Sequence, residues 1–308
     1  MTGVSRRPSN IWLIIVASLF IIVPFLSWYF TWFGRSLSDE KIVEYLADEK
    51  KPRNIQHALT QIESRMEKND PAVKKFYPRI LELTKSPTGE VRKTVAWVMG
   101  QDTTSEDFHR ALLELLKDLE PLVRRNAALQ LVRFTGANGK PDASGRSELR
   151  AMLQPFEAKS PITGTIVSIL PVGSELRAGA LLARIRVTSP PLTTGTDAAA
   201  SPIVNPTPNI QHPTPVIVSG DLQELRAPVD GEIASLAIKE GDTVTAGQTI
   251  ATLKPDEASV SASLRALAYV GTSDDLPFIE ALAQPGGDAE IASQASTTAK
   301  AVRSRSSQ

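Results

Sequence analysis

The histidines are the residues best suited to chemistry in this chain, because imidazole is a common general base and metal ligand. The chain has three of them, His57, His109 and His212, and they stand far apart in the sequence. No two of them share the H-x-x-x-H spacing that places two ligands on one helix face. We therefore predict no metal site and no histidine-based catalytic site.

Other common catalytic motifs are also missing from the sequence. No G-x-S-x-G nucleophile elbow occurs. The stretch Gly136 to Lys140 has the composition of a phosphate loop, but it lacks the earlier glycine and the following Ser or Thr that such a loop requires. We predict that the chain is not an enzyme, has no catalytic residues and binds no cofactor.

The composition of the chain argues against nucleic-acid binding and against thiol chemistry. Its 308 residues include 34 basic and 34 acidic side chains, so there is no basic excess for nucleic acid, and it has no cysteine for disulfide or thiolate chemistry. Two basic pairs do recur, Arg92-Lys93 and Arg124-Arg125. They fit either a basic ridge for an acidic partner or an ordinary solvated helix face.

Two stretches of the sequence repeat one another and share regularly spaced turn residues. Residues 160–185 contain SPITGTIV, VGSELRAG and LLARI, and residues 227–253 contain APVDGEIA, EGDTVTAG and TIATL, with one extra position in the second copy. Each copy predicts small antiparallel strands in which every glycine occupies a turn with positive φ. The matching residues are Pro161, Gly164, Gly173 and Gly179 in the first copy, and Pro228, Gly231, Gly241 and Gly247 in the second.

The pattern A-P-x-x-G-x-[IV], followed by G-[DS]-x-[LV]-x-[AK]-G-x-x-[IL]-x-x-[IL], resembles the half-motif of biotinyl/lipoyl domains. It is similar to the half-motif of the barrel-sandwich hybrid in membrane fusion proteins, which are periplasmic adaptors of efflux and secretion systems. The resemblance implies a module of this type over residues 155–254. It also implies a function in docking other proteins, among them an inner-membrane transporter.

A role as a carrier subunit of a biotin- or lipoyl-dependent enzyme complex is disfavoured. Carrier domains of the family modify a lysine at the hairpin between the two halves, and residues 186–226 contain no lysine. The nearest lysines, Lys159, Lys239 and Lys254, stand at other places. A covalent arm needs an amine, so the alternative stays open only as a minor one.

The junction between the two halves also departs from the adaptor family. Residues 187–221 are rich in Pro, Thr, Ser and Ala, which predicts a flexible loop that is partly polyproline II. Membrane fusion proteins usually carry a long α-helical hairpin here. The absence of this hairpin argues against a direct contact between this chain and an outer-membrane channel.

An uncharged segment over residues 11–33 follows a short N-terminal tail, residues 1–10. Its length suffices to span a bilayer core of about 30 Å. Four aromatic residues, Trp28, Tyr29, Trp32 and Phe33, gather at its far end, as in an interfacial belt. A cleaved signal peptide is the alternative, but no small-x-small site follows the apolar run. We predict an uncleaved transmembrane helix.

The charges that flank this segment indicate its orientation only weakly. Arg6 and Arg7 precede it, whereas Arg35 and Lys41 follow it, which slightly favours a cytoplasmic N-terminus. The adaptor resemblance implies the same orientation. We therefore expect a single-pass protein of the bacterial inner membrane, with residues 34–308 in the periplasm.

Residues 38–154 carry apolar stripes with the i, i+3, i+4 spacing of helices that bury one face. FYPRILEL at 76–83 matches FHRALLEL at 108–115, and Val91-Arg92 matches Val123-Arg124 at the same offset. A period of roughly 30–40 residues made of helices predicts a solenoid of helix pairs. The Val-Arg-x-x-[AV]-Ala core resembles HEAT repeats.

The helical pattern resumes after the predicted β module, over residues 256–284. Once residues 155–254 are removed, the interval between Val123 and Val260 is close to one repeat. We infer that the module is inserted into the solenoid. A helix pair that packs on the module without joining the array is the alternative. Residues 285–308 show no stripe and are predicted to be a disordered tail.

The predicted fold is an α+β multidomain chain with an N-terminal transmembrane helix, a HEAT-like α-solenoid and an inserted β barrel-sandwich hybrid. The predicted function is that of a membrane-anchored, extracytoplasmic assembly or adaptor protein that binds other proteins. A structural envelope protein without a link to transport is a further alternative.

Overall fold

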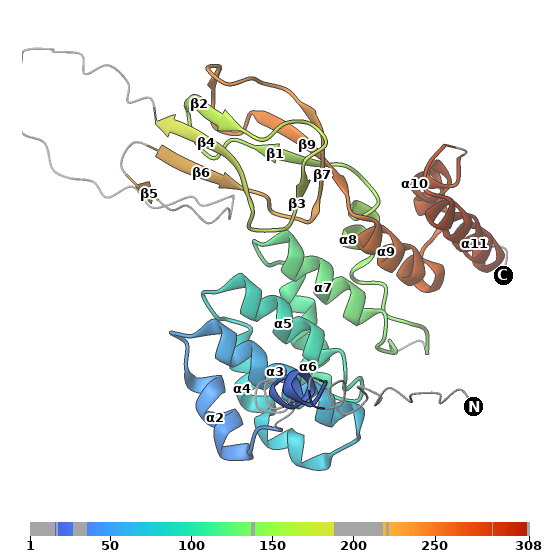
Figure 1. Cartoon of the computed structure of the whole chain (residues 1–308). Coiled ribbons are helices and arrows are strands. Elements are labelled where there is room, and N and C mark those ends of the chain that lie inside the picture. The colour runs from blue at the N-terminus through green and yellow to red at the C-terminus, as the bar shows by residue number, and fades with distance from the viewer. Residues whose placement is uncertain are drawn as a thin grey trace, which may run out of the picture. The chain divides into compact units, whose positions relative to one another are not determined.

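The computed structural model describes residues 16, 18–26, 36–136, 139–187, 218–219, 222–284 and 286–306. The fold mixes helices and β-strands, in agreement with the predicted α+β class (Figure 1). The chain divides into two compact units, residues 1–61 and 62–308, and each is described by itself.

The first unit contains α2 (Asp39–Ala47) and most of α3 (Pro52–Glu67). The Ser38 side chain caps α2 by accepting a hydrogen bond of 3.3 Å from the Lys41 backbone N–H, and the side chains of Ile42 and Leu46 are buried. Among the described residues, no helix has the length and apolar character needed to cross a membrane. The predicted span over residues 11–33 lies mostly outside the described residues.

Short helices in the second unit pack on their neighbours along the chain, because each buries one apolar face. Val91, Val95, Phe108 and Leu112 are fully buried between them. Contacts join α4 to α5, α5 to α7 and α6 to α7. These elements are the 3₁₀ turn η1 (Pro71–Phe76), α4 (Tyr77–Leu83), α5 (Gly89–Met99), α6 (Glu106–Leu115), α7 (Pro121–Leu131) and α8 (Arg146–Ala151).

Two antiparallel sheets follow α8 and form the β module of residues 155–255 (Figure 1). Within the described residues, the strand order is β1-β9-β7-β3 in one sheet and β5-β6-β4-β2-β8 in the other. The strands are β1 (Phe156–Lys159), β2 (Gly164–Ile169), β3 (Glu175–Leu176), β4 (Leu181–Val187), β5 (Val218–Ser219), β6 (Leu222–Arg226), β7 (Gly231–Leu236), β8 (Thr243–Val244) and β9 (Thr249–Pro255).

The predicted loop over residues 187–221 is shorter at both ends than expected. Val187 belongs to β4, and Val218–Ser219 pair with β6. Residues 188–217, 220 and 221 lie outside the described residues.

Helices on both sides of the β module share one hydrophobic core. Leu149 and Met152, which precede the module, are buried together with Val260 and Leu264, which follow it. The Ser263 hydroxyl adds a buried hydrogen bond of 2.5 Å to the Leu149 backbone carbonyl. The later elements are α9 (Glu257–Val270), the 3₁₀ turn η2 (Ser273–Asp275), α10 (Leu276–Leu282) and α11 (Ala289–Ser306). The β module therefore lies in the sequence between two helices, α8 and α9, that contact one another.

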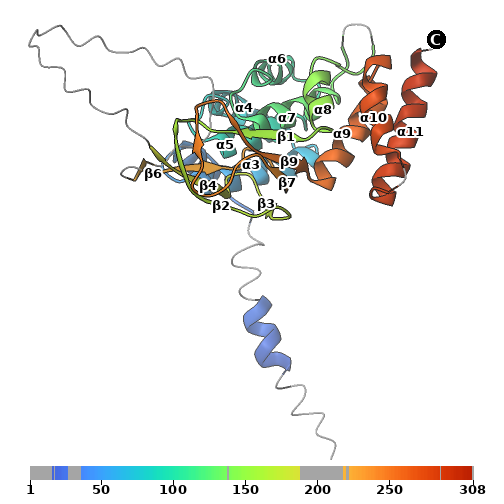
Figure 2. The same ribbon diagram turned by 90° about the horizontal axis from the view of Figure 1, so that it is seen from above.

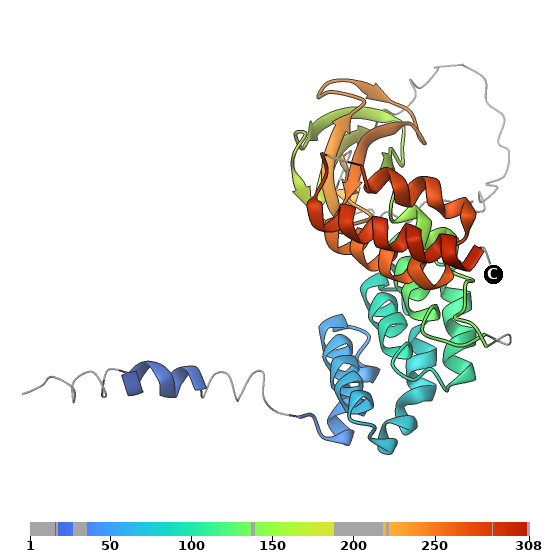
Figure 3. The ribbon, with the colours of Figure 1, turned by 90° about the vertical axis from the view of Figure 1, so that its right-hand side faces the viewer.

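The prediction of a disordered tail over residues 285–308 is wrong. Residues 289–306 form the helix α11, which packs along α9 and α10 (Figures 2 and 3). Its buried face consists of small side chains, Ala295, Thr298, Ala299 and Val302. Small residues produce a weak apolar stripe in the sequence, yet they let two helices approach closely, so the contact becomes evident only in the fold.

Candidate functional site

Backbone hydrogen bonds tie the two half-motifs of the β module together in a reciprocal pattern. Gly173 N–H in the first half donates to Ile233 O in the second, at 2.8 Å, and Gly241 N–H in the second donates to Ile166 O in the first, at 2.9 Å. Ile166 and Ile233 occupy equivalent places in the two copies of the repeat. The halves are therefore related by a pseudo-twofold axis, and each donates backbone hydrogen bonds to the other.

A second pair of bonds repeats the same relationship. Gly179 N–H donates to Ala227 O, and Gly247 N–H donates to Ser160 O, each at 2.8 Å. Strands of one half also lie beside strands of the other, because β2 pairs with β8 and β7 pairs with β3. One continuous core fills the module, and its fully buried members include Ile185, Ile233, Ile250 and Leu253.

The predicted turn residues fall into two structural classes rather than one. Gly173, Gly179, Gly241 and Gly247 have φ between 82° and 90°, as expected for tight turns. Pro161 and Pro228 lie in the bends that precede β2 and β7. Positive φ was expected also at Gly164 and Gly231, and that expectation is wrong.

Close backbone approach explains these two glycines. Gly164 begins β2 and Gly231 begins β7. A Cβ atom at Gly164 would lie 2.2 Å from Arg186 O, and one at Gly231 would lie 2.3 Å from Lys254 O. Only glycine allows the paired strand to come this near.

The lysines of the β module lie away from the junction between its halves. Lys159 ends β1 and pairs with Glu157 at 3.4 Å, whereas Lys239 lies in the turn between β7 and β8. Lys254 lies near the end of β9. None of the three falls within residues 186–226, the junction between the two halves.

His109 is half-buried on α6 and belongs to a small polar cluster. Its Nε2 atom lies 2.5 Å from Asp142 Oδ2, and its ring stacks on Phe134 with centroids 5.1 Å apart. The Ser144 hydroxyl donates a hydrogen bond of 2.6 Å to Asp142 Oδ1. The cluster ties α6 to the loop before α8, and because its two ends are far apart in the sequence, no local pattern indicated it.

Burial raises the pKa of Asp142, but hydrogen bonds from Ser144 and His109 outweigh that effect, and the pKa lies below its usual range. The other histidines form no comparable site, since His57 is exposed, at 6.0 Å from the Tyr45 ring, and His212 lies outside the described residues. Over the described part of the chain, no group of three potential ligands is arranged to hold a metal.

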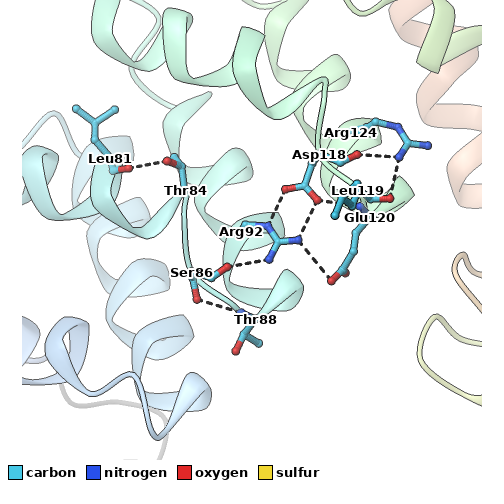
Figure 4. A network of polar contacts seen from close by, with 9 residues as sticks. All are labelled: Leu81, Thr84, Ser86, Thr88, Arg92, Asp118, Leu119, Glu120 and Arg124. Carbon is cyan, nitrogen blue, oxygen red and sulfur yellow. Dashed lines mark hydrogen bonds and ion pairs between the residues drawn. The ribbon is translucent and has the colours of Figure 1, made fainter. Parts of the chain in front are cut away.

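The recurring arginines form structural contacts, so neither a basic ridge nor a solvated face describes them (Figure 4). Arg92 on α5 makes two bonds to Asp118, of 2.6 and 2.9 Å, and donates to Ser86 O at 2.8 Å. Arg124, its counterpart on α7, bonds Glu148 at 2.9 Å and Asp118 O at 2.9 Å. Each arginine thus binds a backbone carbonyl that precedes its own helix and a carboxylate from the following segment.

Lys93 and Arg125 complete the two basic pairs in different ways. Lys93 forms an ion pair with Glu90 one turn earlier, at 2.6 Å. Arg125 is buried, with 4% of its surface exposed. None of the four basic side chains therefore belongs to an open basic surface.

Clefts lie between the β module and the helices. One of about 280 Å³ separates the first residues of α5 and α7 from Gly179 and Pro228. Another of about 660 Å³ lies among β3, Gly231 and the start of α9, and its walls carry several carboxylates.

The chain matches no protein-family model and no curated protein. Among solved structures, it is similar to a single-chain, multi-domain long-chain acyl-CoA carboxylase at 13% sequence identity and a TM-score of 0.22. The match covers 41% of this chain and 10% of the carboxylase chain. A similarity this weak supports no statement about fold or function.

Proposed function

We propose that the chain is a non-enzymatic, membrane-anchored, extracytoplasmic assembly protein. In this proposal, residues 155–254 are a biotinyl/lipoyl-like barrel-sandwich hybrid that docks protein partners, and the helices form a HEAT-like solenoid that binds them. The observation that carries it is the reciprocal pairing of two half-motifs whose junction contains no lysine, within a module inserted between α8 and α9.

Exposed apolar side chains support protein binding by both the helices and the β module of the second unit. Trp97 on α5 is 43% exposed, and Val172 in the turn between β2 and β3 is 57% exposed. Tryptophan at a surface is a frequent binding hot spot. An inner-membrane transporter is the partner class that the adaptor resemblance suggests.

Affinity capture of the full chain from detergent-solubilised membranes tests the proposal. We expect a stable protein partner with the unaltered chain and a clear loss of that partner with Trp97→Ala or Val172→Ser. Lys117→Ser is the matched control, because that side chain is 73% exposed and pairs only within its own helical segment. Capture that returns no partner, or one that all variants retain equally, would contradict the proposal.

The carrier alternative predicts a covalent adduct. Intact-mass measurement of the chain purified from its native host would reveal a biotinyl or lipoyl group. The assembly proposal expects the unmodified mass in this measurement.

Reporter fusions at both termini test the membrane anchor and its orientation. The proposal expects a cytoplasmic N-terminus and a periplasmic C-terminus, with a chain that stays in the membrane fraction. A structural envelope protein would give the same topology, but no permease would co-purify with it.

A further inference from the structure

One polar cluster occurs twice in the helices, once in each of two consecutive repeats. In the first, the Tyr77 hydroxyl at the start of α4 donates a hydrogen bond of 2.7 Å to Asp102 Oδ2. In the second, His109 Nε2 on α6 lies 2.5 Å from Asp142 Oδ2. Tyr77 and His109 stand 32 positions apart, which is the offset of the sequence repeat. The first repeat consists of α4, α5 and the connection over residues 100–105, and the second of α6, α7 and the connection over residues 132–145.

The other oxygen of each aspartate is also bound in the same way in both repeats. Asp102 Oδ1 accepts from the backbone N–H and the hydroxyl of Thr104, at 3.0 and 2.6 Å. Asp142 Oδ1 accepts from the same two groups of Ser144, at 2.7 and 2.6 Å. A side chain that bonds the backbone two residues later forms an Asx turn, which fixes the local direction of the chain. Each aspartate therefore joins the first helix of its repeat to the connection that leads to the next helix.

The two clusters keep this geometry although the connections differ in length. The ring residue and its aspartate are 25 positions apart in the first repeat and 33 in the second, so the second connection is longer by eight residues. Backbone bonds close the added stretch, since Asp142 N–H donates to Phe134 O at 3.0 Å and Gly136 N–H donates to Lys140 O at 2.8 Å. The insertion thus leaves the aspartate in place beside the ring of His109.

The electrostatics of the two aspartates agree as well. Burial raises the pKa of Asp102, but hydrogen bonds from Thr104 and Tyr77 outweigh that effect, and the pKa lies below its usual range, as it does for Asp142. Both carboxylates are therefore ionised near neutral pH and accept hydrogen bonds only. A phenol O–H and an imidazole N–H can each supply the donor that such a half-buried carboxylate needs.

We infer that Tyr77 and His109 are equivalent positioning residues, which hold each connection through its aspartate, and that phenol and imidazole are interchangeable in this role. The matching geometry at both aspartates carries the inference, because the two clusters lie in different repeats and bind different connections. This role accounts for His109 as the counterpart of a tyrosine. The inference concerns the helices alone and does not depend on the proposed function.

Ring variants of the full chain separate the hydrogen-bond donor from the packing of the ring. Tyr77→Phe and His109→Phe keep an aromatic ring but remove the group that donates to the aspartate. Each should lower the melting temperature by roughly 3–10 °C, because a half-buried carboxylate then loses a hydrogen bond. His57→Phe is the matched control, since His57 is an exposed histidine on α3, and it should leave the melting temperature unchanged.

The exchanged variants Tyr77→His and His109→Tyr test the equivalence of the two positions. Each supplies the donor that the other repeat uses, and each should retain at least half of the melting temperature that the corresponding Phe variant loses. Phe variants that melt with the native chain would overturn the inference. Exchanged variants that melt no higher than the Phe variants would overturn it equally.

A carboxyl NMR titration gives a second readout, which a loss of ring packing alone would not move. The pKa of Asp142 should rise in His109→Phe and return towards its lowered value in His109→Tyr, because the donor is removed and then restored. The pKa of Asp102 should stay unchanged in both variants and rise only in Tyr77→Phe. A pKa of Asp142 that is the same in all variants would contradict the role of His109.

Discussion

Arg305 Nη2 on α11 donates a hydrogen bond of 2.7 Å to the backbone carbonyl of Gly271, just after the last turn of α9. The same guanidinium also donates to the carbonyls of Leu267 and Ala268. The last carbonyls of a helix have no partner within it, so Arg305 satisfies the C-terminal end of α9 from another helix.

We expect Arg305→Ala to lower the free energy of unfolding by about 1 kcal/mol, the usual worth of such hydrogen bonds. Arg303→Ala is the control, because Arg303 is 61% exposed and pairs with Glu280 at the surface. Urea denaturation of both variants measures the difference. Equal losses in the two variants would speak against the capping role.

Removal of α11 should destabilise the second unit. A chain that ends after Gln284 exposes the core residues that α11 covers, and we expect a loss of about 3 kcal/mol or more. A chain that ends after Ser306 should keep its full stability. Thermal melting followed by circular dichroism compares the two truncations. A melting temperature that the longer deletion leaves unchanged would support the prediction that residues 285–308 are disordered.

The Arg92–Asp118 ion pair should contribute strongly to the stability of the packed helices α5 to α7. Its side chains are 13% and 8% exposed, so removing one partner leaves a charge with little access to water. We expect Arg92→Met to cost about 3 kcal/mol. In a double-mutant cycle with Asp118→Asn, the two losses should not add, and strict additivity would show that the pair is not coupled.

The Asp142 cluster should contribute stability that depends on pH. Because its pKa is lowered in the folded state, the contribution is present above the pKa of the unfolded carboxyl and is lost as pH falls through the folded value. Asp142→Asn should therefore cost about 1.5–3 kcal/mol at neutral pH and flatten the acid limb of the stability curve. Urea melts between about pH 3 and 7 test this. An acid limb identical to that of the native chain would contradict it.

Gly231 should tolerate alanine less well than Gly247, although the two occupy the same half-motif. Alanine at Gly247 only has to adopt positive φ in open space, which costs about 1 kcal/mol. Alanine at Gly231 collides with the backbone of β9 and should cost about 3 kcal/mol. Melting temperatures of the two variants give the order, and the reverse order would contradict the close-approach explanation.

Features that depend on local periodicity can be predicted from the amino-acid order alone. The helical stripes of residues 38–154 follow from a side-chain period that each helix carries within itself, and the internal repeat placed Ile166 and Ile233 at equivalent positions. The mixed α+β class follows from the same local signals. The lysine-free junction is likewise a property of the sequence alone.

Contacts between groups that are distant in the sequence became evident only in the folded chain. The side chains of His109 and Asp142, of Arg92 and Asp118, and of Arg305 and the end of α9 are joined by packing rather than by spacing. The two glycine classes share a residue type but differ in what surrounds them, turn or neighbouring backbone. The small residues of α11 produce only a weak apolar stripe, and their stabilisation comes from close contact with a partner helix that the linear sequence does not specify.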